Sequence, residues 1–172
     1  SKALTDFEGK GLTVQKRDGK VYVSMENKLL FKSGSWAVNT EGKNAIIQLG
    51  NVLAKNPDIA VLIEGHTDDV PFSNSGQISN NWDLSTKRAT AIISILAENK
   101  VISLENLTAA GRGKYAPVDS NDTPVGKAKN RRIEVVLTPK LDKISFGTVF
   151  ISGLNVFGEQ SYKTGDRPAC KT

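Results

Sequence analysis

The sequence predicts an α/β (α+β) sandwich in which helices pack on one mixed parallel and antiparallel sheet. Three observations predict this fold: an alternating segment around a turn dipeptide near the N-terminus, two stretches with helical apolar spacing, and short apolar runs after each of them. Their order indicates a βαβαβ-β arrangement with at least one parallel crossover. With 172 residues, the chain can form one domain core and is too short to expect two.

The first predicted element is a β-hairpin over residues 11–26. Apolar and polar residues alternate on both sides of Asp18-Gly19, a dipeptide that is strongly favoured in two-residue hairpin turns. We expect residues 1–27 to form an N-terminal strand or hairpin extension and residues 28–140 to form the main domain.

A helix and a strand follow the hairpin. The helix can be capped by Asn39 or Thr40 and is stopped at residues 56–58, which include a proline. Its inner stripe has helical spacing and consists of Ala45, Ile46, Leu49, Val52 and Leu53. Residues 59–64 are almost continuously apolar, which is typical of a strand covered on both faces.

The second half of the main domain again has a helix followed by a strand. A long loop over 68–80, rich in Ser, Asn and Gly, leads into a helix from about Leu84 to Asn99. A short strand over 107–110 is expected to end at Gly111-Arg112-Gly113. Residues 123–126 predict a turn or short helix, and residues 133–138 predict the final strand.

The remainder, residues 141–172, is an extension of unknown role, for which we expect one or two extra strands or a packed segment. The only cysteine, Cys170, lies there, so no disulfide can form within the chain. No apolar run is long enough to span a bilayer, and the N-terminal residues lack a leader pattern. We therefore expect membrane association only through a missing upstream anchor.

The charge is compatible with several partners. A net charge of +5 suits nucleic acid, an acidic polymer or a membrane surface, but the only dense basic cluster is 127–132. A solvated face explains that cluster equally well. Only 6% of residues are aromatic, too few for the stacking platforms of nucleic-acid modules, so we expect no nucleic-acid partner.

Charged residues gather where the strand over 59–64 ends and where the second helix begins. Strand ends and helix starts converge at ligand sites in α/β folds. Helical geometry places Arg88 at the edge of the buried stripe, whereas Lys87 points away. A guanidinium near the core needs an anion, and Asp68 is the best-placed candidate. An ion pair that only ties the helix to the sheet is the alternative.

Other side chains near this strand end offer different chemistry. His66 is the only histidine, and we interpret it as structural, hydrogen-bonding loop backbone, in preference to a metal ligand. Asp68 and Asp69 are neighbours on an extended chain and point to opposite sides, which disfavours a shared acid/base role. Trp82 can stack on a ligand, although such a tryptophan more often fastens the entering chain to the helix.

Four motifs, taken together in their order and spacing, resemble the OmpA-like peptidoglycan-binding domain family. Within that family, the Asp69-Val70-Pro71 segment and the long loop after it are most similar to the MotB-type branch. The resemblance covers residues 29–137, and the motifs are Gly65-His66-Thr67-Asp68, Asn81-x-x-Leu84-Ser85-x-x-Arg88-Ala89, Gly111-x-Gly113-x-x-x-Pro117 and Asn130-Arg131-Arg132-Ile133-Glu134. It implies a βαβαβ-type sandwich.

The resemblance also implies a ligand and a set of site residues. Asp68 and Arg88 would hold the diaminopimelate residue of a peptidoglycan stem peptide, with Asn81, Leu84 and Arg131 in the pocket and Thr67 beside it. Diaminopimelate has a free zwitterionic end, which requires both an anion and a cation or N–H donors. We expect the helix N-terminus at Leu84 to supply such donors.

The function implied is noncatalytic anchoring of an envelope protein to the cell wall, in the periplasm and associated with the outer membrane or cell envelope. No catalytic residue, metal or cofactor is implied, and a homodimer is compatible with the resemblance. The alternative is a peptidoglycan hydrolase that uses His66 with Asp68 or Asp69. Two features depart from the simplest members: the loop between Asp68 and Asn81 is longer, and the region after Lys140 has no counterpart.

Overall fold

The structure, a computed structural model, describes residues 9, 11–32, 34–72, 78–98 and 102–140. Five strands form one sheet in the order β1-β2-β5-β3-β4. The strands are β1 (Leu12–Arg17), β2 (Lys20–Glu26), β3 (Ile59–His66), β4 (Leu107–Gly113) and β5 (Arg132–Pro139). The helices are α1 (Asn27–Leu30), α2 (Thr40–Ala54), α3 (Asn81–Ala97), the short 3-10 helix η1 (Leu104–Asn106) and α4 (Pro124–Asn130).

The predicted N-terminal hairpin is confirmed and is continuous with the sheet. Asp18 and Gly19 have φ values of 51° and 71°, as expected for a two-residue hairpin turn with both central residues in the left-handed region. β2 pairs antiparallel with β5, so that Val23 lies opposite Val135. The hairpin therefore extends the same sheet that contains the central strands.

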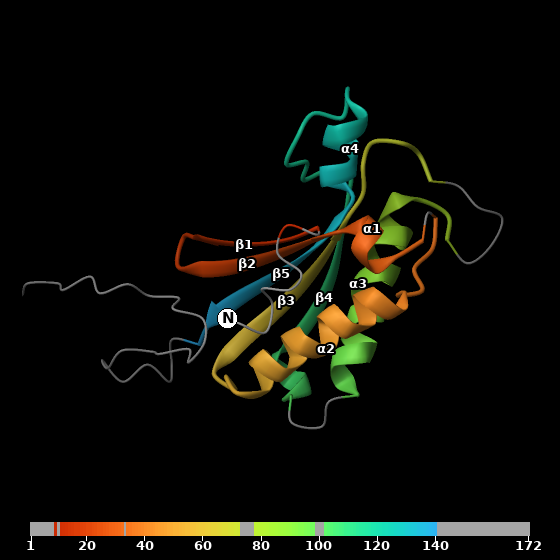
Figure 1. Cartoon of the computed structure of the whole chain (residues 1–172). Helices are drawn as coiled ribbons and strands as arrows, with labels where there is room; N and C mark the ends of the chain where they lie inside the picture. The colour runs from red at the N-terminus through yellow and green to blue at the C-terminus, as the bar shows by residue number, and fades with distance from the viewer. Residues whose placement is uncertain (1–8, 10, 33, 73–77, 99–101, 141–172) are drawn as a thin grey trace, which may run out of the picture.

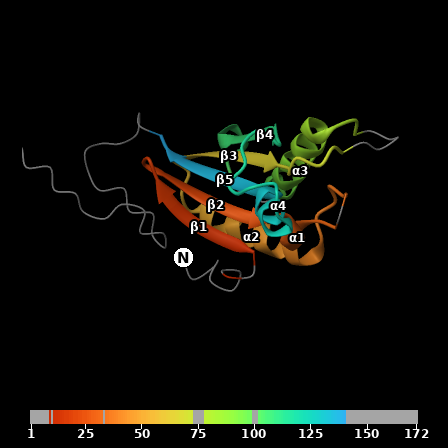
Figure 2. The same cartoon turned by 90° about the horizontal axis from the view of Figure 1, so that it is seen from above.

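The mixed sheet and the parallel crossover are also as predicted. β3 pairs in parallel with β4, with α3 between them in the sequence, and pairs antiparallel with β5. Figures 1 and 2 show α2 and α3 on one side of the twisted sheet, and α4 beyond the end where β3 and β4 finish. The carboxyl ends of two parallel strands thus lie at the same end of the molecule as the N-terminus of α3 and as α4.

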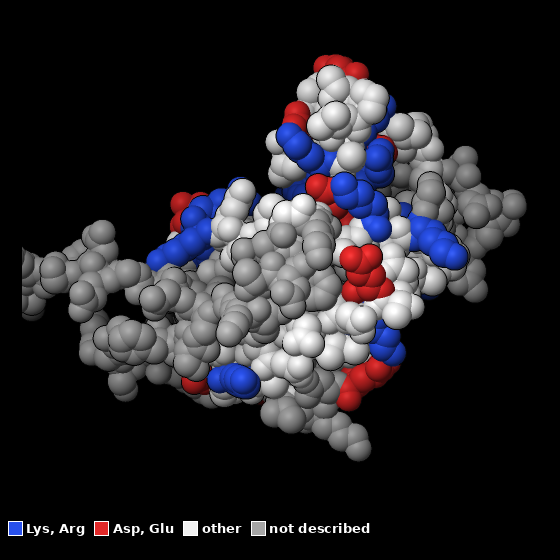
Figure 3. All heavy atoms as spheres, viewed as in Figure 1, with Lys and Arg blue, Asp and Glu red and all other residues white. Residues whose placement is uncertain are grey.

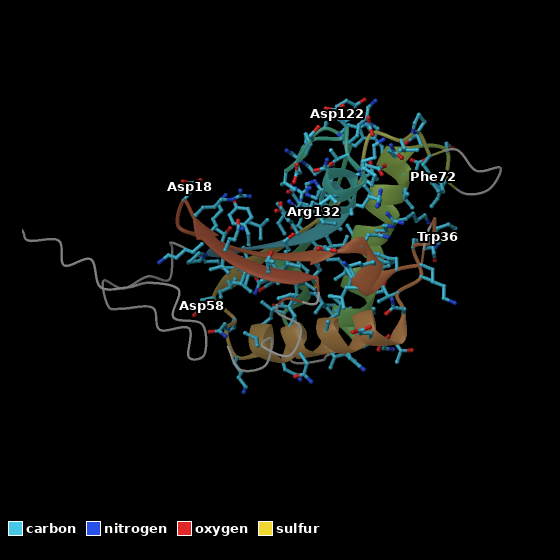
Figure 4. All side chains as sticks on the ribbon, turned by 45° about the horizontal axis from the view of Figure 1, so that its top comes forward. Asp18, Trp36, Asp58, Phe72, Asp122 and Arg132 are labelled. Atoms are coloured by element: carbon cyan, nitrogen blue, oxygen red, sulfur yellow. The ribbon has the colours of Figure 1, made fainter. Side chains whose placement is uncertain are left out.

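The two long helices pack their predicted apolar stripes on the sheet. Asn39 caps α2, because its side chain accepts a hydrogen bond from the Gly42 N–H at 2.7 Å. Buried side chains of α2 and α3 meet those of the strands in one continuous core, which includes Ile46, Leu49, Ile63, Ile92, Leu96, Ile133 and Val135. Figure 4 shows the side chains around this frame, with Asp18 at the far end of the hairpin.

Two details of β3 and β4 differ from the predictions. Burial alternates along most of β3, because the helices that the structure describes cover one face of the sheet, so the prediction of a strand covered on both faces was wrong. β4 continues through Gly111 to Gly113 instead of ending before them. A Cβ at Gly65 would lie 2.0 Å from the Ser85 carbonyl oxygen, and one at Gly111 2.2 Å from Thr86 Oγ1. Glycine is required inside these strands because α3 lies directly on them.

The start of α3 is also different. The helix begins at Asn81, three residues before the predicted start at Leu84, because Asn80 caps it by accepting from the Asp83 N–H at 3.0 Å. The one-turn helix α1 was not predicted. The extension over 141–172, with Cys170, lies outside the described residues. Among the residues that the structure does describe, no helix has the length and apolar character needed to cross a membrane.

Candidate functional site

A pocket of about 610 Å³ lies where β3 ends, bounded by α1, α3, α4 and the loop after β3. All six residues predicted for the ligand site line it: Thr67, Asp68, Asn81, Leu84, Arg88 and Arg131. They come from three segments that are distant in the sequence and meet at the end of the molecule where α4 lies (Figure 1).

Two acidic residues line this pocket: Glu26, which pairs with Lys28 at 3.0 Å, and Asp68, which is buried with 6% of its surface exposed. Its Oδ2 accepts a hydrogen bond from Arg131 Nη1 at 2.5 Å, and its Oδ1 accepts from the Val70 N–H at 3.2 Å. Arg131 immediately follows α4 and keeps 39% of its side chain exposed. One carboxylate oxygen is therefore held by a cation that still faces the solvent.

Arg88 is more deeply buried, with 4% exposed, and its charge is not matched in the same way. Its Nε donates to the Ser35 carbonyl oxygen at 2.9 Å, and its guanidinium lies 5.2 Å from the centre of the Phe31 ring. Among the described residues, Arg88 forms no ion pair with a carboxylate. The prediction that Asp68 pairs directly with Arg88 was wrong, because Arg131 occupies Asp68 instead.

The electrostatics of Arg88 reflect this arrangement. The pKa of Arg88 is lowered to about 10, first by burial and then by the nearby Arg131, while Asp68 partly opposes the shift. Arg88 still carries its proton at neutral pH. Among the described lining residues, Glu26 is already paired with Lys28, so Arg88 and Arg131 have the carboxylate of Asp68 alone between them. The pocket therefore lacks one negative charge.

Asn81 and Thr67 shape the loop that forms one wall of the pocket. Asn81 Nδ2 donates to the Val70 carbonyl oxygen at 2.9 Å, and its Oδ1 accepts from the Phe72 N–H at 3.2 Å. Thr67 Oγ1 donates to the Asp68 carbonyl oxygen at 2.9 Å. Both side chains fix the backbone at and after Asp68, so they help to position its carboxylate and also line the pocket.

Leu84 supplies an apolar wall and not the backbone donor that was expected. Its N–H donates to the Asn80 carbonyl oxygen at 3.1 Å, inside the first turn of α3. The expectation of free N–H donors at Leu84 was wrong because the helix starts three residues earlier. Ligand contacts from this residue would be van der Waals contacts.

Several lining residues were not found from the sequence. Lys28 and Phe31 reach the pocket from α1 and the residue that follows it, and Phe72 reaches it from the loop after β3. Figure 4 shows Phe72 and Trp36 on one side of the molecule, with Arg132 well away from them beside α4. Phe31 belongs to an apolar run that indicated only core, so no local signal distinguished it from a buried residue.

The two neighbouring aspartates have separate partners, as predicted. Asp69 is exposed and pairs with Lys127 of α4 at 3.0 Å, outside the pocket. The basic cluster over 127–132 is likewise occupied by carboxylates, since Lys129 pairs with Asp119 at 2.7 Å. Figure 3 shows acidic side chains interspersed among the basic ones on the face beside α4. The cluster is therefore not a uniform basic surface.

His66 lies on the other face of the sheet, in what we call the open-face cluster, which consists of Glu64, His66, Arg132 and Glu134. The His66 Nε2 atom is 3.6 Å from a Glu64 oxygen and 3.7 Å from a Glu134 oxygen. Neither ring nitrogen has a hydrogen-bond partner among the described residues, so the prediction that His66 binds loop backbone was wrong. Burial, followed by Arg132 and Arg112, lowers the pKa of His66 to about 3, so the ring is neutral at pH 7.

The same cluster is the one group among the described residues whose donor atoms fit a metal ion. One atom each from Glu64, His66 and Glu134 lies within 4.8 Å of the others. Arginines already balance the carboxylates, because Arg132 is 3.4 Å from Glu134 and Arg112 is 3.8 Å from Glu64. A divalent cation would meet this positive charge at close range, which makes the cluster a poor metal centre.

Known proteins resemble this chain in both sequence and fold. The OmpA family model matches residues 30–131. Motility protein B of Bacillus subtilis is 36% identical over 118 residues, which cover 69% of this chain and 45% of that protein. The peptidoglycan-binding protein ArfA of Mycobacterium tuberculosis is 38% identical over 81 residues, or 47% of this chain and 23% of that protein. The chain thus spans less than half the length of these two relatives.

A solved structure agrees with the sequence relatives. The cell wall anchor of the T6SS from Pseudomonas aeruginosa superposes with a TM-score of 0.72 at 27% identity, covering 80% of this chain and 95% of that one. The family model matches more than half of the chain, and the fold is shared with this solved structure. The chain belongs to the OmpA family.

Proposed function

We propose that this chain binds peptidoglycan without cleaving it and so anchors an envelope protein to the cell wall in the periplasm. The names of two relatives support this proposal, since one is called peptidoglycan-binding and the other a cell wall anchor. The ligand group is the diaminopimelate residue of the stem peptide, and the pocket at the end of β3 is its site. The membrane in which the parent protein sits is then the outer membrane or another envelope membrane.

The unmatched charge of Arg88 is the observation that carries the proposal. A buried guanidinium without a carboxylate partner is costly, and a ligand carboxylate that enters the pocket offsets that cost. The free end of diaminopimelate also bears an ammonium group, for which Asp68 supplies an anion. Arg88 and Arg131 would share the carboxylate, and Asp68 would then bridge Arg131 and the ammonium.

The pocket supports binding more readily than hydrolysis. The alternative hydrolase requires His66 to act with Asp68, but His66 faces the open-face cluster and does not line the pocket. Asp69 is turned outward to Lys127. Weak binding at one site is sufficient for an anchor, because the wall is a polymer of repeated sites and tethering raises the effective concentration.

Binding of a diaminopimelate stem peptide to paired variants tests the site. We expect Asp68→Asn and Arg88→Met to weaken binding at least about 30-fold in calorimetry, as for loss of a buried charge partner. Asp69→Asn and Lys87→Met are matched controls, because each alters the neighbouring charge that faces away from the pocket, and they should stay within about twofold. Equal binding by all four variants, with unchanged co-sedimentation with purified sacculi, would contradict the proposal.

A second ligand tests the chemical class. A stem peptide with lysine in place of diaminopimelate keeps the ammonium and lacks the terminal carboxylate. We expect the wild-type chain to prefer the diaminopimelate peptide about 10-fold or more, and Arg88→Met to lose that preference. Release of soluble fragments from labelled peptidoglycan by the purified chain would instead favour the hydrolase.

A further inference from the structure

Two aromatic side chains are stacked on the surface close to the pocket without lining it. Trp82, in the first turn of α3, is 48% exposed, and Tyr115, just after β4, is 66% exposed. Their ring centres are 5.2 Å apart and their planes differ by 24°. The pair leaves a large aromatic surface in water, which is costly unless it serves an interaction.

The backbone that supports this pair is the same backbone that supports the pocket. A Cβ at Gly113 would lie 3.5 Å from Trp82 Cδ2 and 3.6 Å from Tyr115 Cδ2, so both rings rest beside this residue. The Gly113 carbonyl oxygen accepts a hydrogen bond from the Thr67 N–H at 2.9 Å, directly before Asp68. Gly113 therefore supports the aromatic pair and also holds the residue that precedes Asp68.

The pair and the pocket share the first turn of α3. Trp82 follows Asn81, which lines the pocket, and consecutive Cα atoms are about 3.8 Å apart. Three residues of extended peptide reach about 10 Å. A stem peptide whose diaminopimelate occupies the pocket can thus place the sugar at its other end within reach of the two rings.

We propose that the Trp82–Tyr115 pair is a subsite for sugar rings of the glycan strand that carries the bound stem peptide. This inference rests on the proposed function and extends its ligand from peptide to glycan. Sugar rings present flat arrays of C–H groups that pack on aromatic faces, while their hydroxyl groups stay hydrated. The Lys114 ammonium lies 5.8 Å from the centre of the Tyr115 ring, where it can donate to sugar oxygens at the edge of the platform.

Two ligands with the same peptide test the subsite: a stem peptide without sugar and a muropeptide with its disaccharide. We expect Trp82→Ala to weaken muropeptide binding about three- to tenfold and to leave binding of the sugar-free peptide unchanged. Trp82→Phe should retain most of the affinity, because it keeps an aromatic face. Leu104→Ala is the control for an exposed apolar residue elsewhere, as Leu104 is 57% exposed on η1.

Fluorescence reports the contact directly. The chain has two tryptophans, so Trp36→Phe leaves Trp82 as the single reporter. We expect the disaccharide muropeptide, and not the sugar-free peptide, to shift its emission. Thermal unfolding of Trp82→Ala checks that the fold is retained.

The possible outcomes separate the two proposals. If Trp82→Ala weakens both ligands equally, or neither, the glycan subsite is overturned while the peptide pocket stands. If wild type binds neither ligand, the proposed function itself fails. If the chain binds phospholipid vesicles and Trp82→Ala removes that binding, the platform is a membrane contact and the glycan inference is wrong.

Discussion

Two groups of buried charges lie at the carboxyl end of β3, one on each side of the sheet, and they differ in how their charges are matched. In the pocket, Arg88 has no carboxylate partner among the described residues and adjoins open space. In the open-face cluster, Arg132 lies 3.4 Å from Glu134. Because an unmatched buried charge is costly, its presence beside a hollow indicates a ligand, whereas a matched charge indicates structure.

The strongest test of this contrast is Arg132→Met. It should lower the free energy of unfolding by about 3–5 kcal/mol, because it leaves Glu134 buried without its closest cation. It also removes the hydrogen bond that Arg132 Nη2 donates to the Ala116 carbonyl oxygen at 3.2 Å. Urea unfolding measures the change, with Lys129→Met as the control at an exposed pair. A loss below 1 kcal/mol would show that the cluster is not structural.

The pH dependence of stability tests His66. The unfolded chain protonates this ring near pH 6.5, whereas the folded chain keeps it neutral down to about pH 3. The unfolded state therefore binds more protons between these values, and stability falls as the pH falls, by at most about 1.4 kcal/mol per pH unit. Urea unfolding from pH 4 to 7 should show a steeper slope for wild type than for His66→Gln. Identical slopes would mean that His66 titrates normally in the fold.

Substitution of Arg88 is expected to affect stability in the opposite way to substitution of Arg132. Arg88→Met should leave the free energy of unfolding unchanged or raise it by about 1 kcal/mol, because it removes a desolvated cation that has no ion pair in the free protein. The same variant should lose ligand binding. Parallel unfolding and binding measurements decide the point, and a drop in stability as large as that of Arg132→Met would erase the distinction between the two groups.

The smallest effect is expected outside both groups, at the ion pair between the exposed Asp69 and the half-buried Lys127. Lys127→Ala should change the free energy of unfolding by no more than about 1 kcal/mol, and any effect should shrink with added salt. Thermal unfolding at low and high salt is the measurement. A larger, salt-independent loss would indicate that this contact organises the position of α4.

The main features of the fold were predictable because local signals agreed with the final packing. Asp18-Gly19 has the left-handed conformation that the turn requires, and Asn39 caps the helix as its side chain allows. The features that were predicted wrongly depend on contacts between elements that are distant in the sequence. The glycines of β4 indicated an end to the strand, yet they belong to it because α3 lies against them, and that close approach cannot be inferred from the strand sequence alone.

Part of the pocket lining was predictable, whereas the ion pair within it was not. Strand-end and helix-start signals located Asp68 and Arg88, and the family resemblance added Arg131. The ion pair between Asp68 and Arg131 joins residues 63 positions apart, a separation at which helical or strand periodicity carries no information. Phe31 was missed for a related reason, since an apolar residue that faces a pocket has the same sequence pattern as one that faces the core.

Arg131 and Arg132 are adjacent, yet the first enters the pocket and the second enters the open-face cluster. Successive residues of an extended chain point to opposite faces, so chain length up to this point decides which arginine serves which side. A single-residue insertion between α4 and β5 would turn Arg131 toward the open-face cluster and Arg132 toward the opposite face of the sheet, although both arginines would still be present. Homologous sequences in this family are therefore expected to tolerate length changes in the long loop after β3 and to exclude them at this junction.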